Sequence, residues 1–298
     1  MVAGNLQQRV AEWVNIPAFL AVALWGSTYV VIKIAVRDHF TPLNLAAMRL
    51  VLGALVLFLI LLIMEKDWRI ERKDILMMAL LGLTGLAAFQ ILFIEGLKYT
   101  TASNSSVVVS TSPIFAAITI FITRVDNLRW RTAAGIVLAF GGVALVAQRE
   151  GLSFGQESGL LGDIFTLLAA ISWGFFVAVQ TPILRRHSPL KVMTYATIFG
   201  SVFVLPFTAG DLLAQDWGAV SLEGWGLGIY YVIASGVVAT ILWSRGIRNW
   251  GPAKTSVYSY LNPIFGIVTG VLFLEERLVA VQVVGTLAIF IGLALARK

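Results

Sequence analysis

The 298-residue sequence contains no cysteine, only two histidines, and charged residues at just 13% of positions. The missing cysteines exclude a disulfide scaffold, a thiol nucleophile, cysteine zinc sites and iron–sulfur clusters. Soluble domains carry about 25% charged residues, and disordered chains are poor in apolar ones. Apolar residues here make up 58% of the chain, so the composition indicates a lipid bilayer as the solvent.

Apolar stretches of about 20 residues, long enough to cross a bilayer as helices, recur along the whole chain. Proline, glycine and charged residues separate them, and none alternates in the way that strands of a membrane barrel do. We therefore predict an all-α integral membrane protein with ten transmembrane helices. The expected spans are residues 16–36, 43–64, 75–97, 102–122, 130–148, 160–184, 191–213, 225–244, 253–273 and 279–296.

The lysines and arginines are distributed unequally between the predicted inside and outside segments. If the N-terminus is cytoplasmic, sixteen of the 22 lysines and arginines fall in inside segments and five in outside segments, with Arg49 inside the second span. Cytoplasmic loops carry the basic excess, so we predict a multi-pass membrane protein with both termini cytoplasmic. The net charge of +6 then reflects topology, and we expect no nucleic-acid partner. Residues 1–15 lack signal-peptide features, so we expect no cleavage.

The sequence repeats internally. The segment Thr111–Ala116 (TSPIFA) recurs as Leu261–Gly266 (LNPIFG), at an offset of 150 residues. Each half contains five predicted spans, and an odd number forces the second half into the membrane with the opposite orientation. We predict two inverted five-helix domains, residues 16–148 and 160–296, with a substrate site between them near the midplane. The same offset aligns Gly135 with Gly285 and Gly142 with Gly292, and an offset of 148 aligns Trp25 with Trp173.

These motifs resemble the EamA domain of the drug/metabolite transporter superfamily. The resemblance lies in the opening Leu24–Ser27 (LWGS), with Lys33, Pro42 and Arg49, and in the closing Phe273–Leu278 (FLEERL) after Pro263. It covers nearly the whole chain as two consecutive domains, although Asp126 stands at the acidic position of the first copy. The resemblance implies ten helices and export or exchange of small metabolites. The most similar branch is the bacterial inner-membrane exporters of amino acids, particularly aromatic ones, and of methyl viologen-like cations, so the resemblance implies a bacterial inner membrane.

Aromatic and polar side chains within the spans are the candidate substrate ligands, because polar groups that face lipid cost several kcal/mol. Trp25 and Tyr29 share one face of the first span, and Trp173, Phe176 and Gln180 share one face of the sixth. Their rings suit an apolar side chain and their polar tips suit a zwitterion; the alternative role is packing. Further candidates, for which a helix–helix hydrogen-bond seam is the alternative, are Gln90, Asn104, Ser110, Trp243, Tyr258 and Asn262.

Two charged residues within the spans are candidates for charge coupling. Arg49 lies several residues inside the second span, where it would attract a carboxylate or pair with Glu95 or Asp38. Glu95 is the leading candidate for proton coupling, but it lies near the outer end of its span. Exchange or facilitated efflux is therefore as well supported as a proton-coupled pump.

An enzyme is not expected. Gly151–Gly155 (GLSFG) matches a hydrolase nucleophile pattern, but the topology puts Ser153 outside and His187 inside, and no strand leads into the motif. A membrane-embedded lipid enzyme would need acidic clusters, which we do not find. Another solute class, such as a nucleotide sugar or a cationic drug, remains an alternative. We expect a small-molecule substrate, the bilayer as surroundings, no cofactor or metal, and a chain for which a monomer suffices.

Overall fold

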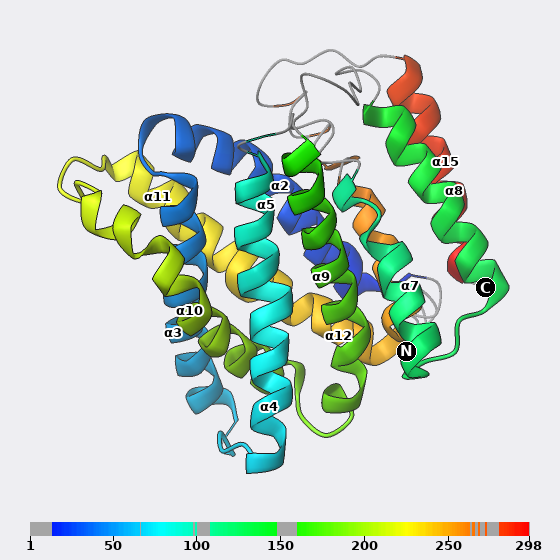
Figure 1. The fold of residues 1–298 in the computed structure, drawn as a ribbon, viewed down its shortest axis with the longest axis horizontal. Helices are drawn as coiled ribbons and strands as arrows, with labels where there is room; N and C mark the ends of the chain where they lie inside the picture. The colour runs from blue at the N-terminus through cyan, green and yellow to red at the C-terminus, as the bar shows by residue number, and fades with distance from the viewer. Residues whose placement is uncertain are drawn as a thin grey trace, which may run out of the picture.

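The fold is built from helices throughout the described part of the chain (Figure 1). The computed structural model describes residues 14–65, 67–97, 99, 108–147, 160–262, 264–265, 268, 272 and 280–297. The helices, in chain order, are α2 (Ile16–Asp38), α3 (Pro42–Met64), α4 (Arg72–Leu81), η1 (Gly82–Ala88), α5 (Phe89–Leu97), α7 (Ser112–Thr123), α8 (Trp130–Ala147), α9 (Leu160–Leu184), α10 (Pro189–Ala214), α11 (Leu222–Tyr231), η3 (Val232–Ala239), α12 (Thr240–Trp250), α13 (Pro252–Ser256), η4 (Val257–Leu261) and α15 (Ala280–Arg297). The predicted all-α class is confirmed for these ranges.

Within the described residues, five continuous helices are long and apolar enough to cross a membrane. They are Pro42–Met64, Arg72–Gly96, Leu160–Leu184, Pro189–Ala214 and Leu222–Trp250. Shorter apolar helices cover Ile16–Thr28, Ser112–Thr123, Trp130–Leu145 and Val283–Ala296. The arrangement of ten spans in two repeats stays a prediction.

Helix starts follow ordinary capping chemistry. The side chains of Thr41 and Ser188 accept hydrogen bonds from backbone amides three residues on, and Pro42 and Pro189 occupy the first turns of α3 and α10. The cap satisfies an amide that has no partner within the helix, and proline at the first position loses no hydrogen bond. The sequence therefore sets where these two spans begin.

Two of the long helices contain a π-helical segment, in which the backbone hydrogen bond spans five residues. The first, η1, lies between α4 and α5 in one continuous helix, and the second, η3, lies between α11 and α12 in another. They begin at Gly82 and Val232, which are 150 residues apart, the same offset as the sequence repeat. π-helical turns are rare and occur frequently at functional sites, so both segments direct attention to the residues that pack on them.

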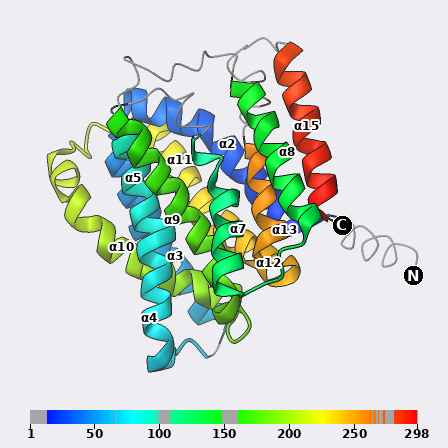
Figure 2. The same cartoon turned by 45° about the vertical axis from the view of Figure 1, so that its right-hand side comes forward.

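Helices α8 and α15 lie side by side, as Figures 1 and 2 both show. Their backbones approach closely because glycines meet in the interface. A Cβ added at Gly142 would lie 2.6 Å from the carbonyl oxygen of Gly285, and one at Gly292 would lie 2.7 Å from that of Gly135. This crossed pairing makes the two helices antiparallel and uses the four glycines that the repeat aligns.

The helix ends gather into two groups at opposite ends of the bundle. In one group Thr41 donates to Asp211 at 2.7 Å. In the other, the fully buried carboxylate of Asp74 contacts Arg186 at 2.7 Å and His187 at 2.6 Å. In this second group a hydrogen bond from Lys191 also holds the pKa of the nearby Asp67 below its ordinary value. Within each group, the segments that are joined are ones that the charge count predicts to lie on the same side of the membrane. By that count the two groups belong to opposite sides.

The outer surface of the bundle is apolar. Ile63, Phe121, Val137 and Leu213 are between 66 and 88% exposed although they lie on helices whose opposite faces are buried. A helix that is hydrophobic all round is either deeply buried or membrane-embedded. The exposed apolar surface therefore supports a bilayer as the surrounding medium.

We predict that Gly142→Ala destabilises the protein whereas Gly141→Ala does not. The methyl group added at residue 142 overlaps the backbone of α15. A methyl group added at residue 141 would have no atom within 4 Å. Overpacking of this kind costs about 1–3 kcal/mol. Thermal unfolding of the two variants in one detergent compares them directly, and equal midpoints would contradict the close packing of α8 on α15.

Candidate functional site

Three tryptophans from three helices meet inside the bundle. Trp25 comes from α2, Trp173 from α9 and Trp243 from α12. The ring centroids lie 5.6 Å apart for Trp25–Trp173, 5.3 Å for Trp25–Trp243 and 6.3 Å for Trp173–Trp243. These separations are within the range of direct aromatic contact. The group, called the tryptophan trio below, combines the first predicted span with the sixth and the eighth.

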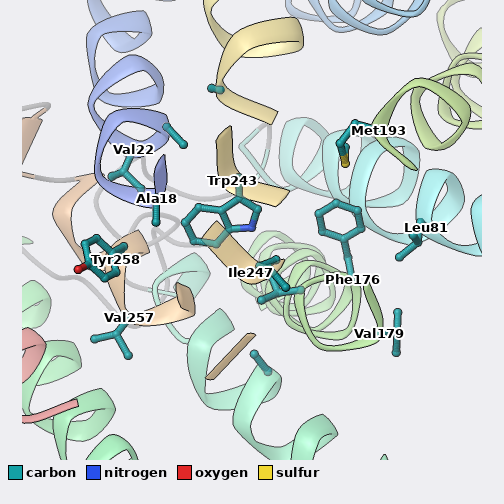
Figure 3. Packing of buried hydrophobic residues seen from close by; sticks show 14 of the residues in the cluster. Ala18, Val22, Leu81, Phe176, Val179, Met193, Trp243, Ile247, Val257 and Tyr258 are labelled. Carbon is teal, nitrogen blue, oxygen red and sulfur yellow. The ribbon is translucent and has the colours of Figure 1, made fainter. Parts of the chain in front are cut away.

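Phenylalanines extend the trio on the side of α9. The rings of Phe176 and Phe89 lie 5.0 Å and 5.1 Å from that of Trp173. Phe176 also packs directly on Gly85 in the π-helical segment η1, where any side chain would collide with its ring. Figure 3 shows Phe176 in the same buried cluster as Trp243 and Ile247.

The trio is tied to the π-helical segments by side-chain hydrogen bonds. Trp25 donates from Nε1 to the carbonyl oxygen of Ser235 in η3 at 3.3 Å. Ser172, next to Trp173, donates to the carbonyl oxygen of Thr84 in η1 at 2.7 Å. Each bond therefore joins a helix of one half of the sequence to the π-helical segment of the other half.

Buried donors without partners accompany the rings. Gln180 is fully buried and its Oε1 accepts a hydrogen bond from Ser244 at 2.9 Å. Its Nε2 atom and the indole Nε1 of Trp243 have no hydrogen-bond partner among the described residues. An unsatisfied buried donor costs about 1–3 kcal/mol, so each such group calls for an explanation, of which a bound water, ion or substrate is one.

Arg49 is a buried cation held by neutral groups. It is only 8% exposed, and its Nη1 donates to Gln90 Oε1 at 3.0 Å while its guanidinium carbon lies 6.0 Å from the centre of the Tyr231 ring. Its Nε atom has no partner among the described residues. Asp38, one expected partner, instead forms an ion pair with the adjacent Arg37. The other expected partner, Glu95, is half-buried in α5 and makes contacts of its own.

Arg49 lies near the trio. Its backbone carbonyl and side chain are within about 3.1 Å of the position that a Cβ on Gly236 would occupy. Gly236 directly follows Ser235, whose carbonyl oxygen accepts the bond from Trp25. The backbone and Cγ of Arg49 and the indole of Trp25 therefore approach adjacent residues of η3. Gln90 directly follows Phe89 of the aromatic group.

The remaining predicted ligands lie elsewhere or outside the described residues. Tyr258 accepts a hydrogen bond from the backbone of Asn15 at 2.9 Å and packs edge-on against Trp250, which is a structural arrangement. Ser110 is half-buried just before α7, and the half-buried Asn262 has an Oδ1 atom without a partner among the described residues. The side chain of Tyr29 and the whole of Asn104 fall outside the described residues.

The sequence did not single out Phe89, Ser235, Ser244 or Thr84, which the structure places at the trio. A usable signal for the aromatic position exists in the repeat. An offset of 150 carries Trp243 onto Phe93, whose ring stacks at 5.9 Å on that of Phe89. No comparable signal marks the two backbone carbonyls.

Taken together, the helical fold and apolar surface define a helical membrane protein. The chain belongs to the EamA-like transporter family, whose model matches residues 13–148 and 160–297. The resemblance found in the motifs is thereby confirmed. A solved crystal structure with 16% sequence identity matches the fold at a TM-score of 0.80 over 95% of each chain.

Similar proteins are named as transporters. An uncharacterized transporter, YetK of Bacillus subtilis, is 25% identical and the match covers 97% of this chain and 87% of that protein. A probable amino-acid metabolite efflux pump of Escherichia coli is 27% identical over 93% of this chain and 92% of its own. A probable terminal-alkyne amino-acid exporter of Streptantibioticus cattleyicolor is 24% identical, covering 86% and 84%. These names are consistent with a protein that is not an enzyme.

We predict that Gln90→Leu lowers the free energy of unfolding by about 1–3 kcal/mol, because it leaves the buried guanidinium of Arg49 without its acceptor. Gln90→Glu retains an acceptor at the same place and serves as the matched control. Thermal unfolding in detergent, read against the unchanged protein, gives the comparison. A Leu variant as stable as the unchanged protein would mean that the Arg49–Gln90 bond contributes nothing.

Proposed function

We propose that this protein exports neutral amino acids, aromatic ones among them, and related small metabolites across a bacterial inner membrane. The observation that carries the proposal is the tryptophan trio with its two unpartnered donors, Gln180 Nε2 and Trp243 Nε1. Indole rings suit an aliphatic or aromatic side chain, and the donors suit a carboxylate. The names of the Escherichia coli and Streptantibioticus cattleyicolor relatives point to the same substrate class.

The buried charge of Arg49 favours an anionic group over a cation at this place. Its neutral partners, Gln90 and Tyr231, leave the positive charge uncompensated among the described residues. In a low-dielectric surrounding a second positive charge nearby is strongly disfavoured, whereas a carboxylate is attracted. Arg49 therefore supports a zwitterion rather than a dication of the methyl viologen kind.

The mechanism that we propose is alternating access between two inverted five-helix domains, residues 16–148 and 160–296. Support comes from features that recur at the repeat offset, the π-helical segments η1 and η3 and the crossed glycine pairs of α8 and α15. The contact of Gly26 with Phe265 also has a counterpart in that of Gly174 with Phe115. Such pseudo-symmetry lets one half take the conformation of the other.

Substrate binding requires the trio to open. The three rings contact one another directly, so an amino-acid side chain enters only when α2, α9 and α12 separate. A substrate that replaces ring–ring contacts with its own stabilises the separated state, and a shift of this kind is what couples binding to a change of access.

The first test is transport in proteoliposomes that carry the purified protein. We expect flux of labelled Phe, Thr or Met above that of empty vesicles, and Trp173→Ala is expected to lower Phe flux by about tenfold. Full burial of a large apolar side chain is worth about 1.5–3 kcal/mol, so loss of the partly buried Trp173 ring forfeits about half of that. A loss of 1.36 kcal/mol is tenfold in rate. Trp130→Ala, which removes a 72% exposed ring, is the control. Absence of flux for every amino acid would end the proposal.

The second test addresses orientation, for which we propose cytoplasmic termini. The natural absence of cysteine allows single-cysteine labelling without a prior cysteine-free variant. In intact spheroplasts a membrane-impermeant maleimide is expected to label Ala219→Cys but not Glu71→Cys, because these exposed positions belong to the two opposite end groups. Permeabilised cells should label both, and the reverse pattern in intact cells would invert the topology.

A further inference from the structure

A polar hollow of about 260 Å³ lies at the common end of α9 and α12. Three charged residues line it: Asp126 between α7 and α8, Arg185 just after α9, and Arg248 in the last turn of α12. Drug-sized ligands occupy pockets of about 300–1,000 Å³, so this smaller volume suits a metabolite. By the proposed topology the hollow opens on the cytoplasmic side, where an exporter takes up its substrate.

The hollow and the tryptophan trio are built on the same two helices. On α12, the hollow-lining Ile247 is one turn after Trp243, and on α9 the hollow-lining Leu184 is one turn after Gln180. One helical turn advances about 5.4 Å. A molecule in the hollow is therefore about one helical turn from the ring cluster.

Unpartnered polar atoms connect the two places. Thr181, which lines the hollow, has a buried Oγ1 without a hydrogen-bond partner among the described residues. Its neighbour Gln180 presents an unpartnered Nε2, and Trp243 an unpartnered Nε1. Three unsatisfied groups in succession are costly in a folded protein, and a polar substrate that moves past them would satisfy each in turn.

We propose that this hollow is the loading site for a zwitterionic α-amino acid, with Arg185 and Arg248 receiving the carboxylate and Asp126 the ammonium group. The inference rests on the proposed function and adds to it the residues that select the substrate's charges. Guanidinium groups recognise carboxylates by paired hydrogen bonds, and a carboxylate binds an ammonium group.

The charges in the hollow are arranged for an external ligand. Asp126 forms no ion pair with Arg185 or Arg248 within the part of the chain that the structure describes. Its Oδ1 accepts a hydrogen bond from the backbone amide of Asn127 at 2.8 Å, which fixes the carboxylate. Opposite charges held apart around one hollow match the two ends of a zwitterion.

Gly251 sets the position of that carboxylate. Its φ of +81° is a conformation that favours glycine, and a Cβ there would overlap Oδ2 of Asp126. The absence of a side chain at residue 251 thus lets Asp126 reach the hollow, beside the sharp turn between α12 and α13.

The test measures half-saturation for labelled L-phenylalanine from each face of proteoliposomes of known orientation. We expect the double variant Arg185→Gln/Arg248→Gln to raise the half-saturating concentration at the cytoplasmic face about fivefold, with the opposite face unchanged. Arg245→Gln is the matched control, because Arg245 is an exposed arginine of α12 that does not line the hollow.

Competitors that carry only one of the two charges test the arginine pair and Asp126 separately. The double variant is expected to lose inhibition by 3-phenylpropionate, which lacks the ammonium group, and to keep inhibition by phenethylamine, which lacks the carboxylate. Asp126→Asn is expected to show the opposite pattern. Both competitors retain the phenyl ring, so binding at the tryptophan trio is held constant.

The outcomes distinguish the two proposals. An equal shift in Arg245→Gln would mean general surface attraction and would overturn the loading site, as would half-saturation that no variant changes. In both cases transport by the unchanged protein would leave the proposed function standing. If the unchanged protein carries no amino acid, the proposed function fails and the loading site fails with it.

Discussion

Close approach of helix backbones is the constraint on which this structure depends. Lipid tails are as apolar as leucine, so helices in a bilayer gain little from apolar contact alone and associate through tight packing and hydrogen bonds. Glycines supply that packing: Gly142 admits the backbone of α15, Gly174 admits Phe115 and Gly26 admits Phe265. The last two directly follow Trp173 and Trp25, so the same contacts that bring the helices together also fix where the two indole rings meet.

The π-helical segments join this packing to the chemistry of the site. Each receives a hydrogen bond from the helix that carries one of the paired tryptophans, at Ser235 or at Thr84. Each also contributes a glycine at a crowded contact, Gly85 beneath Phe176 and Gly236 beside Arg49. Irregular backbone in a membrane is tolerated where protein surrounds it. The two irregular segments are therefore part of the wall of the ring cluster.

The all-α class and the family could be predicted from the sequence, because length, hydropathy and motif spacing are local or periodic signals. The repeat also paired Trp25 with Trp173, which lie 5.6 Å apart. It could not reveal that Trp243 completes the group, since its counterpart is Phe93. Nor could it identify Gln90 as the partner of Arg49, where opposite charge suggested Glu95 or Asp38. Both depend on long-range packing, which local and periodic sequence signals do not encode.

The isolated charge of Arg49 has an electrical consequence. Its described partners are a neutral amide and an aromatic ring, so the full positive charge stays within the bundle. A charge that crosses the whole membrane field exchanges about 2.3 kcal/mol with a potential of 100 mV. If a conformational change moves Arg49 through part of the membrane field, its free energy therefore changes by the same fraction of about 2.3 kcal/mol for each 100 mV. The cell's membrane voltage would then bias which face of the protein is open, even for a substrate that has no net charge.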